Sequence, residues 1–179
     1  MIHTYIPYCP KEKGQDLGWA YNNFMEMIGD DDWACFLDHD AMFTTRDWYH
    51  QLEEMIDKYP HVGVFTAKTN RIGNKAQVLR NVNMHNHNMF YHRQIGKKLQ
   101  KDNRYKLTPS AAPQLLSGVV ILISKKVWKD IGGCKSGFLS VDNDIHQRCL
   151  DKGYEAYIMD GVYTYHWYRA DGDLSHIGK

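Results

Sequence analysis

The sequence lacks cysteine pairs, long apolar runs and a secretion signal. Without a Cys-x-x-Cys pair, it predicts neither a disulfide framework nor a cysteine-based zinc site. No stretch approaches the roughly 18 uninterrupted apolar residues of a membrane span, and no basic start precedes an apolar core. We therefore expect no membrane span and a location in the reducing cytoplasm. The scattered cysteines are Cys9, Cys35, Cys134 and Cys149.

An excess of charge of one sign is also absent. The chain has 22 basic and 21 acidic residues, so its formal charge is +1. Non-specific binding to nucleic acid through net charge is therefore not expected. A local basic patch leaves RNA or DNA binding as a minor alternative. This patch comprises Arg80, Arg93, Lys97, Lys98, Lys101 and Arg104.

The chain does contain short apolar runs that alternate with amphipathic stretches, and its 179 residues predict one domain at 1–179. A helix is expected from Leu17 to Ile28, capped by Asp16 and ended by Gly29. A second helix begins after Thr44 or Thr45 and stops at Pro60. With strands at 2–8, 33–40 and 62–67, this order indicates an α/β layer with a mostly parallel sheet.

The segment at about 68–113 breaks this pattern, because it is polar and rich in Asn and His. We expect an irregular lid or acceptor-side segment there, with one short helix at about 91–99. Its pair His85 and His87 has no acids or cysteines nearby, so we assign no metal to it. Order resumes with strands at 118–124 and 154–160 and helices at 125–131 and 142–152, followed by a Tyr-rich segment ending at His166.

Two acids, Asp38 and Asp40, follow the apolar strand in "FLDHDAMF". Residues two apart in an extended segment point to the same side, so both carboxylates can converge on one cation while His39 points away. For the motif taken alone, a solvated turn after the strand is the simpler explanation. Mg²⁺ or Mn²⁺ would offset the repulsion between the acids.

A second acidic motif, "VDNDIHQR", begins the expected helix at 142–152. Asp142 and Asp144 can stabilise the positive end of the helix dipole, and Asp144 can pair with Arg148 four residues later. A carboxylate at a helix start is also suited to accept a proton from a hydroxyl group. His166, in "YTYHWY", is either a hydrogen-bonded structural residue or a metal ligand.

Three segments resemble, in order and spacing, the GT-A glycosyltransferases, especially the family 2-like group. They are "DDWACFLDHDAMFTTRDWYHQLEEMIDKYPHVGVFTA", "LLSGVVILISKKVWKDIGG" and "GFLSVDNDIHQRCLDKGYEAYIMDGVYTYHWY". The resemblance covers about 16–168, apart from the irregular middle. It implies a single-domain GT-A (Rossmann-like) fold with a mixed, mostly parallel sheet flanked by helices.

The resemblance also implies roles for individual residues. Asp40 would be the main metal ligand, with Asp38 as a second ligand or donor contact and His166 as a further ligand. Asp142 would be the catalytic base. The remaining donor contacts would be Pro7, Ser117 and Gly118, with the last two near the point where donor and acceptor meet.

Two departures from the family pattern stand out. Val141 replaces the first acid of its E-D-x-D motif. The strand that ends in an acidic turn and holds the nucleoside base is missing, because only "YCPKEKGQ" separates Pro7 from Asp16. The donor site is therefore expected to be shortened or altered.

The resemblance implies a metal-dependent glycosyltransferase that uses Mn²⁺ or Mg²⁺. It would move a sugar from a nucleoside-diphosphate sugar to a saccharide or other hydroxyl acceptor, with inversion expected and retention left open. The alternative is a non-catalytic nucleotide- or glycan-binding module with the same fold, which the shortened N-terminal region favours. The sequence does not indicate the donor sugar, the acceptor or the oligomeric state.

Overall fold

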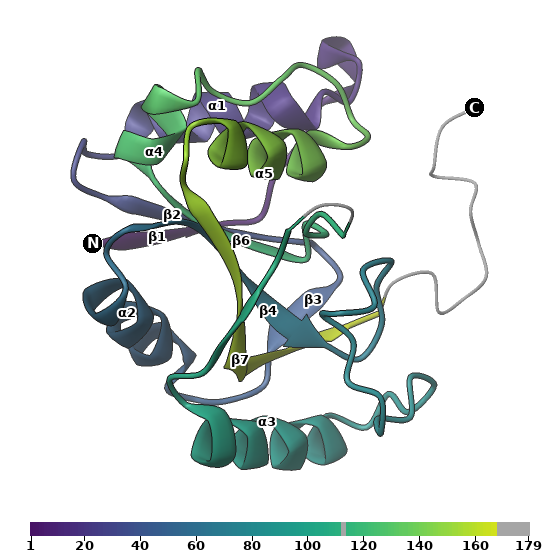
Figure 1. Cartoon of the computed structure of the whole chain (residues 1–179). Helices are drawn as coiled ribbons and strands as arrows, with labels where there is room; N and C mark the ends of the chain where they lie inside the picture. Colours follow the sequence, from purple (N-terminus) through teal and green to yellow (C-terminus); the bar gives the residue numbers. More distant parts are fainter. Residues whose placement is uncertain (112–113, 168–179) are drawn as a thin grey trace.

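In the computed structural model, which describes residues 1–111 and 114–167, the chain forms one α/β domain around a seven-stranded mixed sheet (Figure 1). The strand order is β1-β2-β6-β4-β7-β3, and β5 pairs with β7 beside this path. The strands are β1 (Ile2–Tyr5), β2 (Trp33–Leu37), β3 (Ala41–Phe43), β4 (Val62–Thr69), β5 (Leu107–Pro109), β6 (Val120–Ser124) and β7 (Glu155–His166).

The sheet is mixed as expected, but most pairs of neighbouring strands are antiparallel. Parallel pairing joins β1 to β2 and β4 to β7. Within the described residues every other pairing of strands is antiparallel, including both pairings of β6. The expectation of a mostly parallel sheet was wrong, because an apolar run in the sequence indicates that a strand is buried but not in which direction it runs. The long connection at 70–119 also frees β6 from the geometry of a βαβ unit.

Helices cover both faces of the sheet. Figure 1 shows α1 (Leu17–Met27), α4 (Lys125–Asp130) and α5 (Val141–Asp151) on one face. On the other face lie α2 (Trp48–Lys58) and α3 (Met89–Asn103). No helix in the described part of the chain combines the length and apolar character needed to cross a membrane.

The core has one apolar cluster on each face of the sheet. Ile121 and Ile123 of β6 belong to the cluster beneath α1, α4 and α5. Val120 and Leu122, which alternate with them, belong to the cluster beneath α2. Because successive strand residues face opposite sides, a strand covered on both faces is apolar throughout. The continuous run "VVILI" is therefore explained by the position of β6 between two helical layers.

The ends of the first two helices only partly match expectation. Asp16 caps α1, since its Oδ1 accepts a hydrogen bond from the Trp19 N–H at 2.7 Å. The second helix begins later than predicted, at Trp48. Thr44 is buried instead of capping it, and its hydroxyl donates to the Tyr163 carbonyl oxygen at 2.8 Å. A threonine near a helix start predicts a cap, and the sequence does not reveal that Thr44 binds the distant Tyr163 instead.

The part of the predicted irregular segment that the structure describes, 68–111, is more regular than expected, because α3 spans 15 residues. Residues 112 and 113 lie outside the described residues. Asn88 caps this helix by accepting a hydrogen bond from the Phe90 N–H at 2.9 Å. His92 is fully buried, and its ring lies 2.8 Å from the Tyr163 hydroxyl and 2.6 Å from the Asn86 carbonyl oxygen. A histidine that suggested a loop is thus part of the contact between α3 and β7.

Gly96 lets α3 approach the segment before α2, so Gly96→Ala is expected to destabilise the fold. A Cβ at this position would lie 2.1 Å from Thr44 Oγ1. Overpacking costs about 1–3 kcal/mol, which outweighs the gain of about 1 kcal/mol that alanine brings to a helix. Urea denaturation should show a lower midpoint for Gly96→Ala. The control Gln94→Ala, on the exposed face of α3, should change stability by less than about 0.5 kcal/mol. An increase in stability for Gly96→Ala would contradict the close approach.

Candidate functional site

Five strand ends meet at one edge of the sheet. The carboxyl ends of β1, β2, β4 and β7 lie at the same edge as the amino end of β6, because β6 is antiparallel to β2 and β4. This arrangement places Asp38 after β2 next to the residues that precede β6, and the Asp38 N–H donates to the Val119 carbonyl oxygen at 3.2 Å. Pro7 lies past the end of β1 at this same edge. The expected site residues are therefore gathered by sheet topology.

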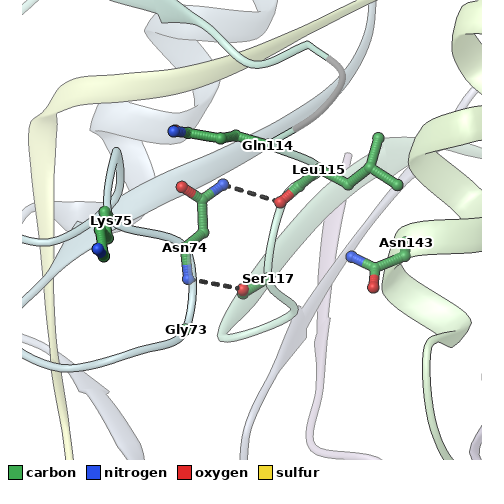
Figure 2. A pocket seen from close by; sticks show the side chains of 7 residues that line it. All are labelled: Gly73, Asn74, Lys75, Gln114, Leu115, Ser117 and Asn143. Atoms are coloured by element: carbon green, nitrogen blue, oxygen red, sulfur yellow. Dashed lines mark hydrogen bonds between the residues drawn. The ribbon is translucent and has the colours of Figure 1, made fainter.

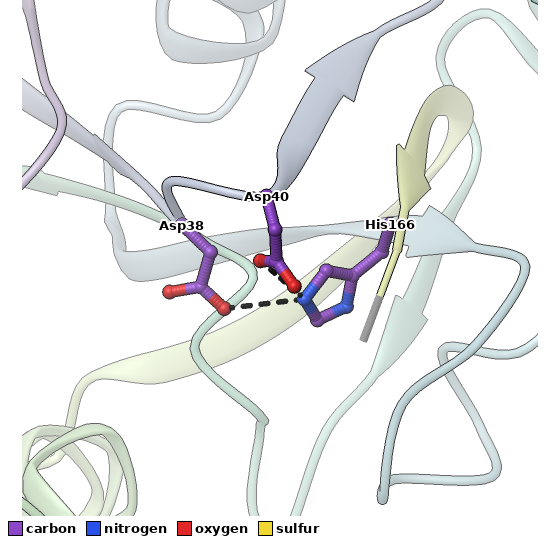
Figure 3. Close-up of side chains that lie close together, drawn as sticks. All are labelled: Asp38, Asp40 and His166. Carbon is purple, nitrogen blue, oxygen red and sulfur yellow. Dashed lines mark hydrogen bonds and ion pairs between the residues drawn. The ribbon is translucent and has the colours of Figure 1, made fainter. Parts of the chain in front are cut away.

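Asp38, Asp40 and His166 form one cluster whose potential ligand atoms all lie within 4.8 Å of one another (Figure 3). His166 Nε2 lies 3.1 Å from Asp40 Oδ1 and 3.6 Å from Asp38 Oδ2. The histidine is only 2% exposed, whereas His39 is exposed and outside the cluster. The expected trio of metal ligands is thus brought together by the fold.

The His166 ring is held in one orientation by the backbone around it. Asn70 Oδ1 accepts from the His166 N–H at 2.8 Å, and the Asn70 amide donates to the His166 carbonyl oxygen at 3.1 Å. Nδ1 lies 3.0 Å from the Arg71 carbonyl oxygen, which accepts its hydrogen. Nε2 therefore faces the two carboxylates. Metal-binding histidines are oriented in this way, with the second ring nitrogen donating to a carbonyl or carboxylate.

The two acids of the cluster have opposite pKa shifts. Burial, reinforced by the charges of Asp40 and Asp142, raises the pKa of Asp38 to about 6 despite the nearby His166. Burial also acts upward on Asp40, but the hydrogen bond and charge of His166 outweigh it and hold the pKa of Asp40 below its ordinary value. One imidazole thus compensates mainly one carboxylate. A divalent cation would compensate both.

This donor set suits a divalent metal ion. Two carboxylate oxygens and one imidazole nitrogen are available, and their ligand atoms already lie close enough to share one ion. Carboxylates suit Mg²⁺ and Mn²⁺, and a neutral imidazole nitrogen is a common ligand of divalent transition metals. We conclude that Asp38, Asp40 and His166 can hold such an ion.

Asp142 lies beside this cluster, in the first turn of α5. Its Oδ2 accepts from the Gly118 N–H at 2.8 Å, and its Oδ1 accepts from the Asn143 N–H at 2.9 Å. Glycine at 118 allows this close approach, because a Cβ there would lie 3.1 Å from the Asp142 Cβ, which is a tight contact. Burial raises the pKa of Asp142, and its charge in turn acts on Asp38. The backbone from Gly118 to Val119 thus connects Asp142 to the metal-ligand cluster.

The other members of the "VDNDIHQR" motif have structural positions. Arg148 Nε lies 2.9 Å from Asp144 Oδ2, which confirms the ion pair expected four residues apart on the helix. Val141 is 1% exposed and belongs to the apolar cluster beneath α1, α4 and α5. The residue that precedes Asp142 is therefore part of the core.

Sequence reasoning missed the amide side chains that connect the loops of the site. Gln77 Oε1 accepts from the Ser117 N–H at 2.7 Å, and its amide nitrogen lies 3.1 Å from the Ser117 carbonyl oxygen and 3.0 Å from Thr66 Oγ1. Asn70 holds His166 as described above. Both are buried, and both belong to "TNRIGNKAQ", directly after β4. Amides just after a buried strand were the signal that could have revealed them.

His146 connects the backbone of Leu116 to that of Ser110. Its Nδ1 accepts from the Leu116 N–H at 2.8 Å, so the hydrogen is on Nε2, which lies 2.9 Å from the Ser110 carbonyl oxygen. The residue is fully buried, and this burial lowers its pKa. The neutral ring is therefore the form that connects the two ends of the loop.

A pocket of about 480 Å³ lies next to the hydrogen bond between Gly118 and Asp142. Figure 2 shows it between the loop at 73–75, the loop at 114–117 and the first turn of α5. Lys75 stands on its rim, and the other lining residues are Gly73, Asn74, Gln114, Leu115, Ser117 and Asn143. Ser117, expected near the meeting point of donor and acceptor, therefore faces a cavity.

The basic and His-rich residues show local pairing. In the expected basic patch, Arg104 forms an ion pair with Glu54, and Lys98 pairs with Asp102 at 3.2 Å. His87 Nδ1 lies 2.6 Å from the Tyr165 hydroxyl. Within the described residues, the Asp38, Asp40 and His166 cluster is the group with metal-binding geometry, and it does not include His85 or His87.

No protein-family model matches the sequence, and a search of curated proteins finds no match either.

His146 is expected to make stability depend on pH. Because its folded-state pKa is lowered, the unfolded chain binds more protons, and the free energy of unfolding should fall as the pH drops below about 6.5. The contribution of one such group is at most about 1.4 kcal/mol per pH unit. Urea denaturation at pH 7.5 and 5.5 should show a smaller loss for His146→Gln than for the wild type.

The control for this measurement is His85→Gln, because His85 is exposed and its side chain is not part of the loop contact. This variant should lose as much stability as the wild type between the two pH values. An identical pH dependence for His146→Gln and the wild type would contradict the role of the neutral ring.

Proposed function

We propose that the chain is a metal-dependent glycosyltransferase that moves a sugar from a nucleoside-diphosphate sugar to a hydroxyl acceptor. The observation that carries the proposal is the convergence of Asp38, Asp40 and His166 at the edge where Asp142 is held. These residues come from three separate parts of the sequence, at 38–40, 142 and 166, and each matches its place in the GT-A pattern. A solvated turn after β2 would not account for their meeting.

The cluster of Asp38, Asp40 and His166 would hold Mn²⁺ or Mg²⁺. A bound cation of this kind neutralises charge on the diphosphate leaving group. The protein's own contribution is to present two carboxylates and an imidazole whose orientation is already fixed by Asn70 and Arg71. A preformed set of ligands avoids an ordering cost when the donor binds.

Asp142 is the proposed general base. Its carboxylate would take the proton of the acceptor hydroxyl as the oxygen attacks the anomeric carbon. One carbon–oxygen bond forms to the acceptor while the bond to the diphosphate breaks, so a single in-line displacement inverts the configuration. The raised pKa of Asp142 makes this carboxylate a stronger base than an exposed aspartate.

A non-catalytic nucleotide- or glycan-binding module is the second candidate, and one observation favours it. β1 is an outermost strand of the sheet. Within the described residues, only the short 3₁₀ turn Lys11–Lys13 and α1 lie between β1 and β2. The strand that would hold a nucleoside base in the GT-A pattern is therefore absent from this connection. Pro7, past the end of β1, is a remaining candidate contact for the donor.

The first test measures donor binding by calorimetry with nucleoside diphosphates and their sugars, with and without Mn²⁺. At least one nucleotide should bind in a Mn²⁺-dependent manner. Asp40→Asn should weaken this binding at least about tenfold, because it removes one charged ligand of the ion.

The matched control is Asp31→Asn, since Asp31 is an exposed acid outside the cluster. It should bind like the wild type. If no nucleotide responds under any metal condition, the proposed function is wrong. Binding of Mn²⁺ alone would support the metal site without the transferase.

The second test addresses Asp142. With a donor that binds, Asp142→Asn should keep donor affinity within about threefold and lower turnover by about 10²–10⁴, the usual contribution of a general base. Release of nucleoside diphosphate in the presence of acceptor sugars is the measurement.

The control Asp151→Asn makes the same change at the exposed end of α5 and should keep full turnover. Equal turnover in Asp142→Asn and the wild type would remove Asp142 from the role of base. If the wild type binds a donor and no donor is turned over, the non-catalytic module is the better description.

A further inference from the structure

The pocket between 73–75, 114–117 and α5 is not used by the metal-ligand cluster or by the base. Its volume of about 480 Å³ lies within the range of about 300–1,000 Å³ that is typical of small-molecule sites. Its wall is built by hydrogen bonds: the Asn74 N–H donates to Ser117 Oγ at 3.2 Å, and the Asn74 amide donates to the Leu115 carbonyl oxygen at 2.8 Å (Figure 2). The cavity is therefore preformed.

We infer that this pocket binds the acceptor, and that the group it holds is an uncharged carbohydrate. This inference rests on the proposed function, because it assigns a substrate class to the acceptor side of the same site. It also gives specificity-determining roles to Gln114, Asn143 and Ser117.

The position of the pocket supports the acceptor role. Three consecutive residues have different neighbours: Ser117 lines the pocket, Gly118 donates to Asp142, and Val119 accepts from the backbone of Asp38. Asn143, on the pocket side, directly follows Asp142. The hydrogen bond between Gly118 and the Asp142 carboxylate thus joins the residue after Ser117 to the residue before Asn143, and the charge of Asp142 also acts on Asp38 of the metal-ligand cluster. A general base has to lie within reach of the hydroxyl group whose proton it takes.

The chemistry of the lining favours hydroxyl groups as partners. Within the described residues, the Gln114 amide has no hydrogen-bond partner, so it offers both a donor and an acceptor. The Asn143 amide nitrogen donates to the Leu116 carbonyl oxygen at 2.9 Å, which leaves Oδ1 as an acceptor. Ser117 Oγ accepts from Asn74, so its own hydrogen remains to donate. Sugar hydroxyls both donate and accept, and they match this mixed set.

The same lining disfavours other ligand classes. Among the described lining residues, no aromatic side chain is present to stack on a nucleobase, and Leu115 is the only large apolar residue. A lipid chain would therefore leave polar groups without partners. Lys75 is exposed on the rim and can donate to a hydroxyl group.

The experiment is an NMR titration of the full chain, labelled with ¹⁵N, without nucleotide or metal. The test ligands are the methyl glycosides of glucose, galactose, mannose and N-acetylglucosamine, and the disaccharides maltose and cellobiose. At least one should cause saturable shifts, in the millimolar range, that are confined to resonances of 73–75, 114–117 and Asn143.

Two variants and a control sharpen the result. Gln114→Trp introduces a bulky side chain at the pocket wall and should abolish the shifts. Gln114→Ala should weaken binding at least about threefold by removing one amide. Gln94→Trp, on the exposed face of α3, should bind like the wild type. Gln114→Trp should keep the Mn²⁺-dependent nucleotide response, because the metal-ligand cluster does not include this residue.

The outcomes separate this inference from the proposed function. Shifts in none of the ligands, or shifts unchanged in Gln114→Trp, overturn the carbohydrate pocket even if nucleotides bind. Glycoside binding at the pocket together with no response to any nucleotide supports a glycan site and overturns the transferase.

Discussion

The antiparallel placement of β6 between β2 and β4 is the constraint on which the candidate site depends. Ser117, Gly118 and Val119 precede β6, so they reach the edge that carries Asp38 only because β6 runs against its neighbours. With β6 reversed, these residues would lie about 17 Å away, the length of a five-residue strand. Asp142 would then lose the Gly118 N–H to which it is bound. The direction of one central strand thus decides whether the acids and the pocket are neighbours.

Buried hydrogen bonds fix the loops that follow the strands. Asn70 holds His166, Gln77 holds Ser117, and His146 connects Leu116 to Ser110. In each case an amide or imidazole side chain is hydrogen-bonded to backbone atoms of another segment. Such contacts are directional, and a buried group that loses its partner costs about 1–3 kcal/mol.

The carboxylates gathered at this edge of the sheet destabilise the protein when no cation is bound. Asp38 is close enough to Asp40 and Asp142 for both to raise its pKa, while His166 compensates mainly Asp40. A structure selected only for stability would separate these charges or pair each with its own cation. Their concentration at the end of several strands, beside a polar pocket, is typical of a site that binds a charged partner.

Local sequence patterns determined the features that depend on neighbouring residues: α1 with its Asp16 cap, the apolar run of β6, and the ion pair of Asp144 with Arg148. They also placed Asp38 and Asp40 together, because both follow one strand. The direction of β6, the full length of α3, the contacts of Asn70 and Gln77, and the pocket beside Asp142 were decided only by the tertiary structure. Each of these depends on partners many residues away, and periodicity along the chain records whether a residue is buried but not which segment covers it.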